Sequence, residues 1–414
     1  MLLKLLKLNK NIRLLVLSQF ISGLGTWLAY IAIPLFALKL TGAGLAVSLV
    51  LILRVLPATF LSPFIGVIID RINRKYVMIF ADILRGIIFV VYPFINTIIW
   101  IYFLTFIETV GGLFFGPART AIVPNIIEEE GELVSANSAL KIVSSSTMLL
   151  GPLIGTGLMT TIGIKWAFWL NALSFFTSAF LLIFMNVKFT KKSSKEISDK
   201  SIRKWTIFAN DIKVALKVLK EIPKLLLIMI VGGLSTAGYG LINVLLPIFA
   251  SRQFELTGAY GLIMSGLGLG ILVGSALTPG LSRRLTFIIL FFLGLIVSGF
   301  MHITFILSTS IVFAILFIAI QGISDAIQQV SYTSLLQTLV KDELRGRISS
   351  FYETVSSVPL LIGLLGGGAL ADLWGTRVVG LIAGIEIIII GFIGFFMAVK
   401  ISESNVILKR KEEI

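Results

Sequence analysis

The chain has 414 residues, of which 57% are hydrophobic and only 14% are charged, and its mean hydropathy is +1.01. This composition excludes an ordinary water-soluble globular domain. Cysteine is absent and His302 is the single histidine, which excludes disulfides, haem, iron–sulfur clusters and Cys/His zinc sites. We therefore expect no cofactor and no metal.

Twelve continuous apolar stretches are each long enough to cross the bilayer core, which requires a helix of roughly 20 residues. In chain order the predicted spans are 14–38, 45–69, 76–96, 98–121, 134–160, 165–187, 225–250, 259–280, 285–306, 310–337, 349–372 and 376–399. The stretches are continuously apolar rather than alternating, which favours helices over strands. The sequence thus predicts an all-α membrane protein with twelve transmembrane helices.

Lysine and arginine are distributed unequally between the two sides of these spans. Only Lys39, Lys165, Arg252 and Arg377 fall in one set of alternate connections, whereas the termini and the other connections hold almost all the rest. Because lysine and arginine are retained on the cytoplasmic face during insertion, we expect both termini inside, in the cytoplasmic membrane of a prokaryote. The net charge of +14 then reflects topology and does not indicate nucleic-acid binding.

The sequence repeats itself at an offset of about 212 residues, which predicts two pseudo-symmetric halves. Pro34-Leu35-Phe36-Ala37 matches Pro247-Ile248-Phe249-Ala250, and Gly151, Gly155 and Gly163 match Gly363, Gly367 and Gly375. We predict a six-helix bundle at 1–187, a cytoplasmic linker at 188–223, a second six-helix bundle at 224–400 and a cytoplasmic tail at 401–414. From Trp205 the linker pattern predicts a basic amphipathic helix on the inner leaflet. Such a duplication suits a transporter that rocks one half against the other.

The turn between the second and third spans has the sequence Gly66-Val67-Ile68-Ile69-Asp70-Arg71-Ile72-Asn73-Arg74-Lys75. It resembles the loop signature of the major facilitator superfamily, G-x-x-x-D-R-x-G-R-[RK], whose extension is present as Asp82 and Arg85. Asn73 stands where the family usually has glycine. Because asparagine also tolerates left-handed backbone, we expect the turn to be kept.

The resemblance implies the twelve-helix major facilitator fold and a gating role for this loop. Asp70 would face the amino-terminal end of the eleventh span, where unpaired N–H groups are partly positive, and Glu353 would be a partner for Arg71 or Arg74. Gly66 would let the second span approach a neighbouring helix closely. The alternative is that these charges only fix topology.

Further motifs resemble the macrolide-efflux and siderophore-exporter branch of the drug–proton antiporters in that family. They are Gly116-Pro117-Ala118-Arg119, Asn171-Ala172-Leu173-Ser174-Phe175 and Asp342-Glu343-Leu344-Arg345-Gly346-Arg347. Gly151, Pro152, Gly155 and Gly157 form the tail of a motif associated with antiporters, although its upstream glycines are missing. We expect these glycines to permit close packing against the eighth span.

Charged residues within the spans are candidates for function, since each costs roughly 2.5–3.5 kcal/mol at the centre of a span. Glu108 and Asp325 lie near the middle of the fourth and tenth spans, which line the central cavity in this superfamily. We predict that they exchange protons against a cationic or polar substrate. The alternative is a structural ion pair with Arg54 or Lys141; we also include Arg54 among the coupling and substrate residues.

A substrate pocket is predicted from polar and aromatic residues of the first, seventh and tenth spans: Trp27, Tyr30, Tyr239, Asn243, Gln321 and Gln328. The sequence as a whole predicts a proton-coupled exporter of amphipathic small molecules that works by alternating access and acts as a monomer. Its expected partners are the substrate, protons and the lipid bilayer. A lipid or lysolipid translocator and an uptake symporter remain alternatives, and a membrane-embedded enzyme is disfavoured because no nucleophile or His/Asp pair clusters at one face.

Overall fold

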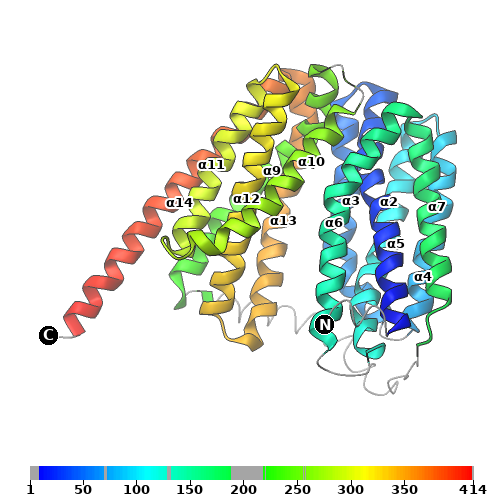
Figure 1. Ribbon diagram of the computed structural model, residues 1–414. Helices are drawn as coiled ribbons and strands as arrows, with labels where there is room; N and C mark the ends of the chain where they lie inside the picture. The colour runs from blue at the N-terminus through cyan, green and yellow to red at the C-terminus, as the bar shows by residue number, and fades with distance from the viewer. Residues whose placement is uncertain are drawn as a thin grey trace. The chain divides into compact units, whose positions relative to one another are not determined.

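The computed structural model describes residues 9–69, 72–127, 132–187, 218–219, 221–254, 256 and 258–412. Twelve helices in this part of the chain are long and apolar enough to cross a membrane. They are α2 (Lys10–Thr41), α3 (Gly44–Ile69), α4 (Arg74–Val91), α5 (Ile98–Ile122), α6 (Glu132–Thr161), α7 (Ile164–Ile183), α9 (Pro223–Gln253), α10 (Ala259–Leu281), α11 (Phe287–Leu307), α12 (Ile311–Leu339), α13 (Asp342–Trp374) and α14 (Thr376–Glu412). Short 3-10 turns, η1 (Tyr92–Phe94) and η2 (Val123–Asn125), extend α4 and α5 (Figure 1). The twelve predicted spans are confirmed. The last helix continues beyond the predicted end of its span, to Glu412.

Glycines with positive φ end or begin several of these helices. Gly42 ends α2 at φ 69°. Gly163 separates α6 from α7 at φ 92°, and Gly375 separates α13 from α14 at φ 83°. A side chain is strained in this backbone region, so glycine is the residue that fits. Gly163 and Gly375 are also a matched pair of the sequence repeat, and their shared geometry supports the duplication.

The chain divides into two compact units, residues 1–198 with 255–265 and residues 199–254 with 266–414. In unit 1, α2 packs against α6 and α7, while α4 packs against α5 and α7 (Figure 1). In unit 2, α9 packs against α13 and α14, while α11 packs against α12 and α14. These contacts correspond one to one under the sequence repeat, so the two six-helix bundles are pseudo-symmetric. Most of the predicted amphipathic linker helix lies outside the described residues.

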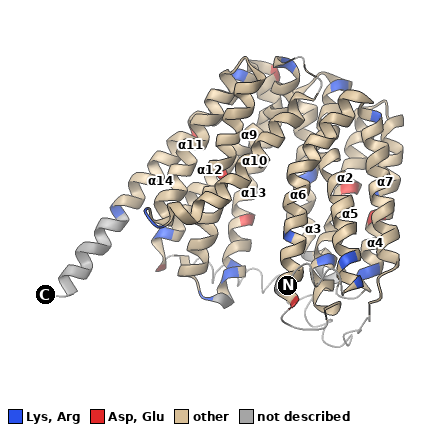
Figure 2. Cartoon of the chain, in the orientation of Figure 1, with Lys and Arg blue, Asp and Glu red and all other residues tan. Residues whose placement is uncertain are grey.

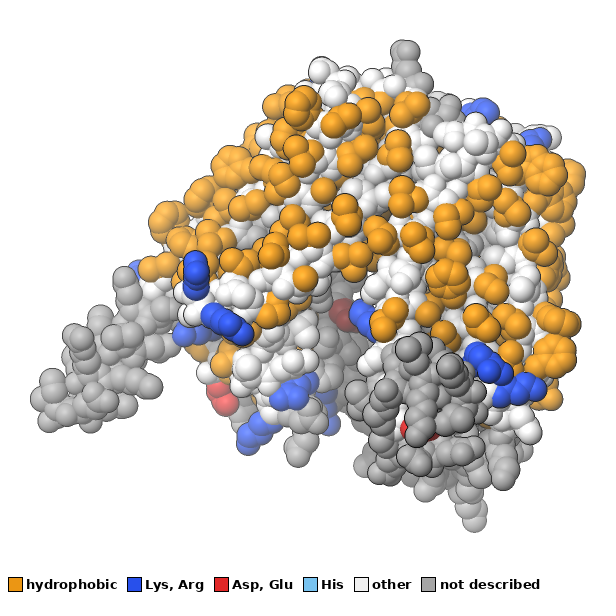
Figure 3. All heavy atoms as spheres, in the orientation of Figure 1, with side chains coloured by type: hydrophobic (Ala, Val, Ile, Leu, Met, Phe, Trp, Pro, Cys, Tyr) orange, Lys and Arg blue, Asp and Glu red, His pale blue; other side chains and the backbone are white. Residues whose placement is uncertain are grey.

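Hydrophobic side chains spread over the visible faces of both units (Figure 3). Phe80, Ile362 and Phe396, for example, are more than 60% exposed. A soluble protein does not present such faces to water, whereas a lipid environment matches them. Lysine and arginine gather mainly at helix ends (Figure 2), as expected for a multi-pass membrane protein.

Candidate functional site

Asp325 is the single charged residue of α12, and its carboxylate is held by neutral donors from three helices. The hydroxyls of Tyr239 on α9 and Ser298 on α11 donate to Oδ1 at 2.9 and 2.8 Å. Gln328, one turn further along α12, donates to the same oxygen at 3.4 Å. Within the described chain, no residue donates to Oδ2 and no lysine or arginine pairs with the carboxylate. The result is a membrane-embedded acid without a countercharge.

This acid lies in the wall of a polar cavity of about 240 Å³ in unit 2. The cavity is lined by Gly232, Ser235, Thr236, Tyr239, Phe291, Asp325, Gln328, Gln329, Tyr332 and Tyr352, contributed by α9, α11, α12 and α13. Nearly all of these residues offer a hydroxyl, an amide or a carboxylate. Because drug-sized sites measure roughly 300–1,000 Å³, the cavity fits a polar group or part of a larger molecule.

Glu108 on α5 is neutralised, in contrast to Asp325. Arg85 on α4 donates to Glu108 Oε1 from Nε at 3.1 Å and from Nη2 at 2.8 Å. Its Nη2 also donates to Thr26 Oγ1 at 3.2 Å, and its guanidinium lies 4.0 Å from the ring centroid of Phe175. Both charged side chains are 8% exposed. They form a buried ion pair within unit 1.

This pair corrects two interpretations of the sequence. Arg54 and Lys141, the partners named in the alternative of a structural ion pair, do not pair with Glu108. Arg54 donates to the Ala29 carbonyl at 3.0 Å and lies over the Tyr30 ring at 5.2 Å, while Lys141 lines a separate cavity with Arg119. Arg85 was assigned to the loop motif, yet it contacts the candidate coupling residue directly.

Asp82, the other residue of the motif extension, is fully buried on α4. The Ser178 hydroxyl of α7 donates to its Oδ2, and Oδ1 has no hydrogen-bond partner. Asp82 therefore contributes to the packing of α4 against α7, and it lies one turn before Arg85. The structure thus brings Asp82, Arg85 and Glu108 into the interior of one bundle.

The predicted loop latch is described only in part. Asp70 and Arg71 lie outside the described residues, Gly66 lies in α3 and Glu353 is exposed on α13. Arg74 donates to the Ala121 carbonyl at 2.8 Å, near the end of α5.

Asn73 does not use the left-handed backbone that asparagine tolerates. Its φ is −62° and its side chain accepts from the Lys75 amide at 3.1 Å, so it caps the start of α4. Lys75 in turn donates to the carbonyls of Ile183 and Met185, both at 2.7 Å, at the end of α7. The described part of the loop is therefore held to its own bundle. Asn73 caps the start of α4, and Arg74 and Lys75 donate to carbonyls at the ends of α5 and α7.

The glycines of the fifth span pack differently from the prediction. A Cβ at Gly151 would lie 2.3 Å from Trp27 Cβ, and one at Gly155 would lie 2.9 Å from Leu28 Cδ2, so both glycines face α2 and not α10. Nothing lies within 4 Å of a Cβ at Gly157. The contact with the start of α10 comes instead from the Pro152 carbonyl and the Thr156 side chain, which lie against Gly261.

The predicted pocket residues fall into separate groups in the two units. Trp27 and Tyr30 form an edge-to-face pair at 5.2 Å in unit 1. Tyr239 and Gln328 line the cavity with Asp325 in unit 2. Asn243 donates to the Tyr239 carbonyl at 2.8 Å, and Gln321 is buried at 2% exposure; neither lines that cavity. The sequence analysis missed Ser298, because an isolated serine in an apolar span gives no signal of its own.

A family model described as Major Facilitator Superfamily matches residues 15–364. The chain is 28% identical to the uncharacterized MFS-type transporter YfiS of Bacillus subtilis (strain 168), over 96% of this chain and 95% of that protein. It is 23% identical to macrolide efflux protein A of Streptococcus pyogenes, over 91% of this chain and 93% of that protein. A crystal structure of a mutant of the nucleoside transporter NupG superimposes with a TM-score of 0.74 at 13% identity, covering 94% of this chain and 100% of that one. At that identity the likeness shows the fold alone.

Proposed function

Because the chain belongs to the Major Facilitator Superfamily, we propose that it is a proton-coupled exporter of amphipathic small molecules in a bacterial cytoplasmic membrane. The chain is a multi-pass membrane transporter and not an enzyme. The proposal adds the driving ion, the direction of transport and the class of substrate. It also places both termini on the cytoplasmic face, in keeping with the lysine and arginine bias of the connections.

The observation on which the proposal rests is the carboxylate of Asp325 in its polar cavity. An uncompensated charge in the membrane interior costs several kcal/mol, and a proton on the carboxylate removes that charge. Oδ1 is occupied by neutral donors, whereas Oδ2 has no donor among the described residues, so Oδ2 is the atom at which the proton binds. Protonation changes the cavity from negative to neutral without breaking an ion pair.

This change of charge couples proton binding to substrate binding. A cationic or strongly polar group of the substrate is stabilised next to the ionised carboxylate, and the protonated acid no longer stabilises it. Substrate and proton therefore compete for one site, and each turnover exchanges one for the other. The tyrosine and glutamine side chains of the cavity wall bind the polar part of the substrate, and the apolar part remains outside this small cavity.

Export is supported by the name of one relative, macrolide efflux protein A, which matches nearly the whole chain. Glu108 has no coupling role in this proposal, because Arg85 already neutralises it. Binding a proton to Glu108 would leave a buried guanidinium without its countercharge. Of the two predicted coupling carboxylates, Asp325 is therefore the one to which we assign coupling.

The test is transport in proteoliposomes with an imposed pH gradient, screened over cationic dyes, macrolides and lysolipids. We expect Asp325→Asn to abolish transport driven by the gradient while the protein stays folded, since the amide keeps the shape and accepts from the same donors. Asp372→Asn is the matched control, because Asp372 belongs to a partly exposed ion pair with Arg252. Undiminished gradient-driven transport by Asp325→Asn would remove Asp325 from the mechanism.

A further inference from the structure

A second cavity, of about 540 Å³, lies at the end of unit 1 where α2 ends and α7 begins. It is lined by Phe36, Lys39, Leu40, Ile95, Asn96, Ile162, Gly163, Ile164, Lys165 and Trp166. Its walls are mainly apolar, and its polar groups are two ammonium groups and one carboxamide. None of its residues belongs to the Asp325 site or to the motifs described above, apart from Phe36 and Gly163, which are part of the sequence repeat.

The two lysines have no countercharge among the described residues. Neither Lys39 nor Lys165 forms an ion pair or a side-chain hydrogen bond within the described chain, and no Asp or Glu occurs in residues 36–50, 90–105 or 155–175, the stretches that contain the lining residues. They are also two of the four cations on the side of the membrane where lysine and arginine are scarce. Two uncompensated positive charges therefore face one cavity.

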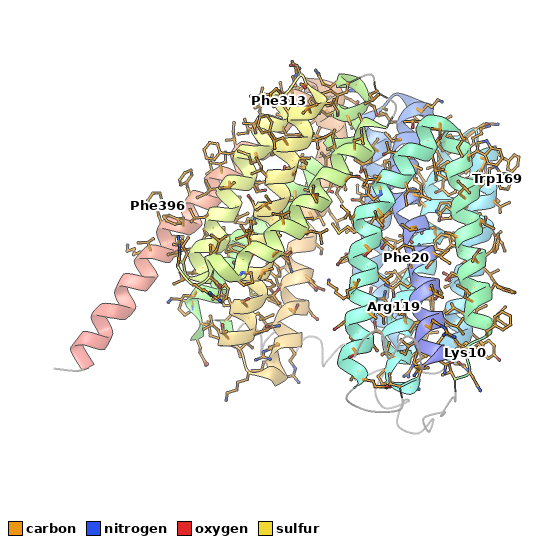
Figure 4. All side chains as sticks on the ribbon, viewed as in Figure 1. Lys10, Phe20, Arg119, Trp169, Phe313 and Phe396 are labelled. Atoms are coloured by element: carbon orange, nitrogen blue, oxygen red, sulfur yellow. The ribbon has the colours of Figure 1, made fainter. Side chains whose placement is uncertain are left out.

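The surrounding residues indicate how deep the cavity lies in the membrane. Lys39 lies in the last turn of α2 and Lys165 in the first turn of α7. Trp100, Trp166 and Trp169 are partly exposed near the same helix ends, and Figure 4 shows Trp169 pointing outward from α7. Tryptophan gathers at the level of lipid headgroups. The cavity thus opens where a phosphate group lies next to acyl chains.

The floor of the cavity is apolar and rigid. Phe36 is 8% exposed and packs edge-to-face on Phe168 at 5.5 Å, and Phe168 stacks on Tyr92 at 4.9 Å. Ile95 is also buried, at 7% exposure. Such a floor fits a hydrocarbon chain, whereas the lysines and Asn96 fit an oxyanion. The apolar part of the cavity thus fits the acyl chain of an amphiphile, and the part with the lysines and Asn96 fits its anionic headgroup.

We propose that this cavity binds an anionic phospholipid from the leaflet at this end of unit 1, with the headgroup phosphate between Lys39 and Lys165 and an acyl chain along Phe36 and Leu40. The bias of the connections predicts this to be the outer leaflet. The Asn96 carboxamide donates to a headgroup oxygen. A zwitterionic lipid is bound less well, because its own cation opposes the lysines.

The experiment measures lipid binding to the purified full chain in neutral detergent by native mass spectrometry, with short-chain phosphatidylglycerol as the probe. Each lysine near an anionic headgroup contributes about 1 kcal/mol, so we expect Lys39→Gln with Lys165→Gln to weaken binding roughly 30-fold. Replacing both lysines with arginine should retain binding. The charge-matched control, Lys10→Gln with Lys341→Gln, removes two exposed lysines outside the cavity and should leave binding unchanged.

Three outcomes would overturn the proposal. Equal phosphatidylglycerol binding by the native chain and the Lys39/Lys165 glutamine variant would remove the lysines from the site. Equally tight binding of short-chain phosphatidylcholine would indicate a non-selective lipid contact. Displacement of phosphatidylglycerol by inorganic phosphate at similar concentrations would assign the cavity to a free anion. Because the readout is lipid binding, failure here is separate from failure of the transport proposal.

Discussion

The Arg85–Glu108 pair gives a quantitative prediction about stability. Glu108→Leu leaves the buried Arg85 guanidinium without its ion-pair partner, and Arg85→Met does the same to the Glu108 carboxylate. Removing one partner of a buried ion pair costs about 3–5 kcal/mol, so we expect either single variant to lose that much free energy of unfolding. The double variant carries no unpaired charge. We expect it to be more stable than either single variant, with a residual loss of about 1–2 kcal/mol from the missing contact with the Phe175 ring.

The assay is reversible unfolding in mixed micelles of SDS and a neutral detergent, monitored by circular dichroism, for the native chain and the three variants. The exposed pair between Arg252 and Asp372, 3.4 Å apart, provides a scale, because such pairs contribute about 0–1 kcal/mol and Asp372→Asn should change little. The reasoning fails if the losses of the two single variants add in the double variant, since additivity means that the two charges do not stabilise each other.

Three further predictions use the same unfolding assay. Ser178→Ala removes the donor to buried Asp82 and should cost about 1–3 kcal/mol; a change below 0.5 kcal/mol, on the order of an ordinary surface substitution, would show that this hydrogen bond does not stabilise the fold. Gly240→Ala should cost about 1–3 kcal/mol, because its Cβ would lie 2.5 Å from the Leu360 carbonyl oxygen of α13, whereas Gly157→Ala, with open space around it, should be tolerated. Gly163→Ala and Gly375→Ala should each cost about 1–3 kcal/mol through their positive φ, and a marked difference between them would argue against their structural equivalence.

The sequence was sufficient to predict the helices, because a membrane span is selected by the length and continuity of its apolar run. α3, α7 and α12 begin and end within a few residues of the predicted spans. The predicted duplication is supported by equivalent helix contacts and by the matched backbone at Gly163 and Gly375. At Asn73, a side-chain cap takes the place of the left-handed backbone that the sequence analysis considered. A single sequence does not distinguish these two uses of asparagine, since both occur next to helix ends.

The partners of the buried charges were harder to predict, because position along a continuously apolar span gives the depth of a residue, whereas a span without clear periodicity does not show the face on which the residue lies. Arg85 and Glu108 are about equally far from the turn that joins α4 to α5, and this equal depth was a signal for their pairing. Arg85 also belongs to the loop motif, and this membership hides the signal. The donors to Asp325 leave a weaker signal in the sequence, because Tyr239 lies 86 residues away on a helix that is not adjacent to α12 in the chain. Only the packing of α9, α11 and α12 brings these side chains together.

The two bundles therefore place carboxylates on equivalent helices in different electrostatic settings. On α5, Glu108 is part of a pair with no net charge, and adding a proton would leave Arg85 as a buried cation at a cost of several kcal/mol. On α12, Asp325 is surrounded by neutral donors, so adding a proton removes a charge from the membrane interior and breaks no ion pair. Of these two carboxylates, Asp325 therefore takes up a proton at a lower electrostatic cost than Glu108. Duplication has produced a symmetric scaffold, and a single arginine, Arg85, gives the two equivalent helices carboxylates in different electrostatic settings.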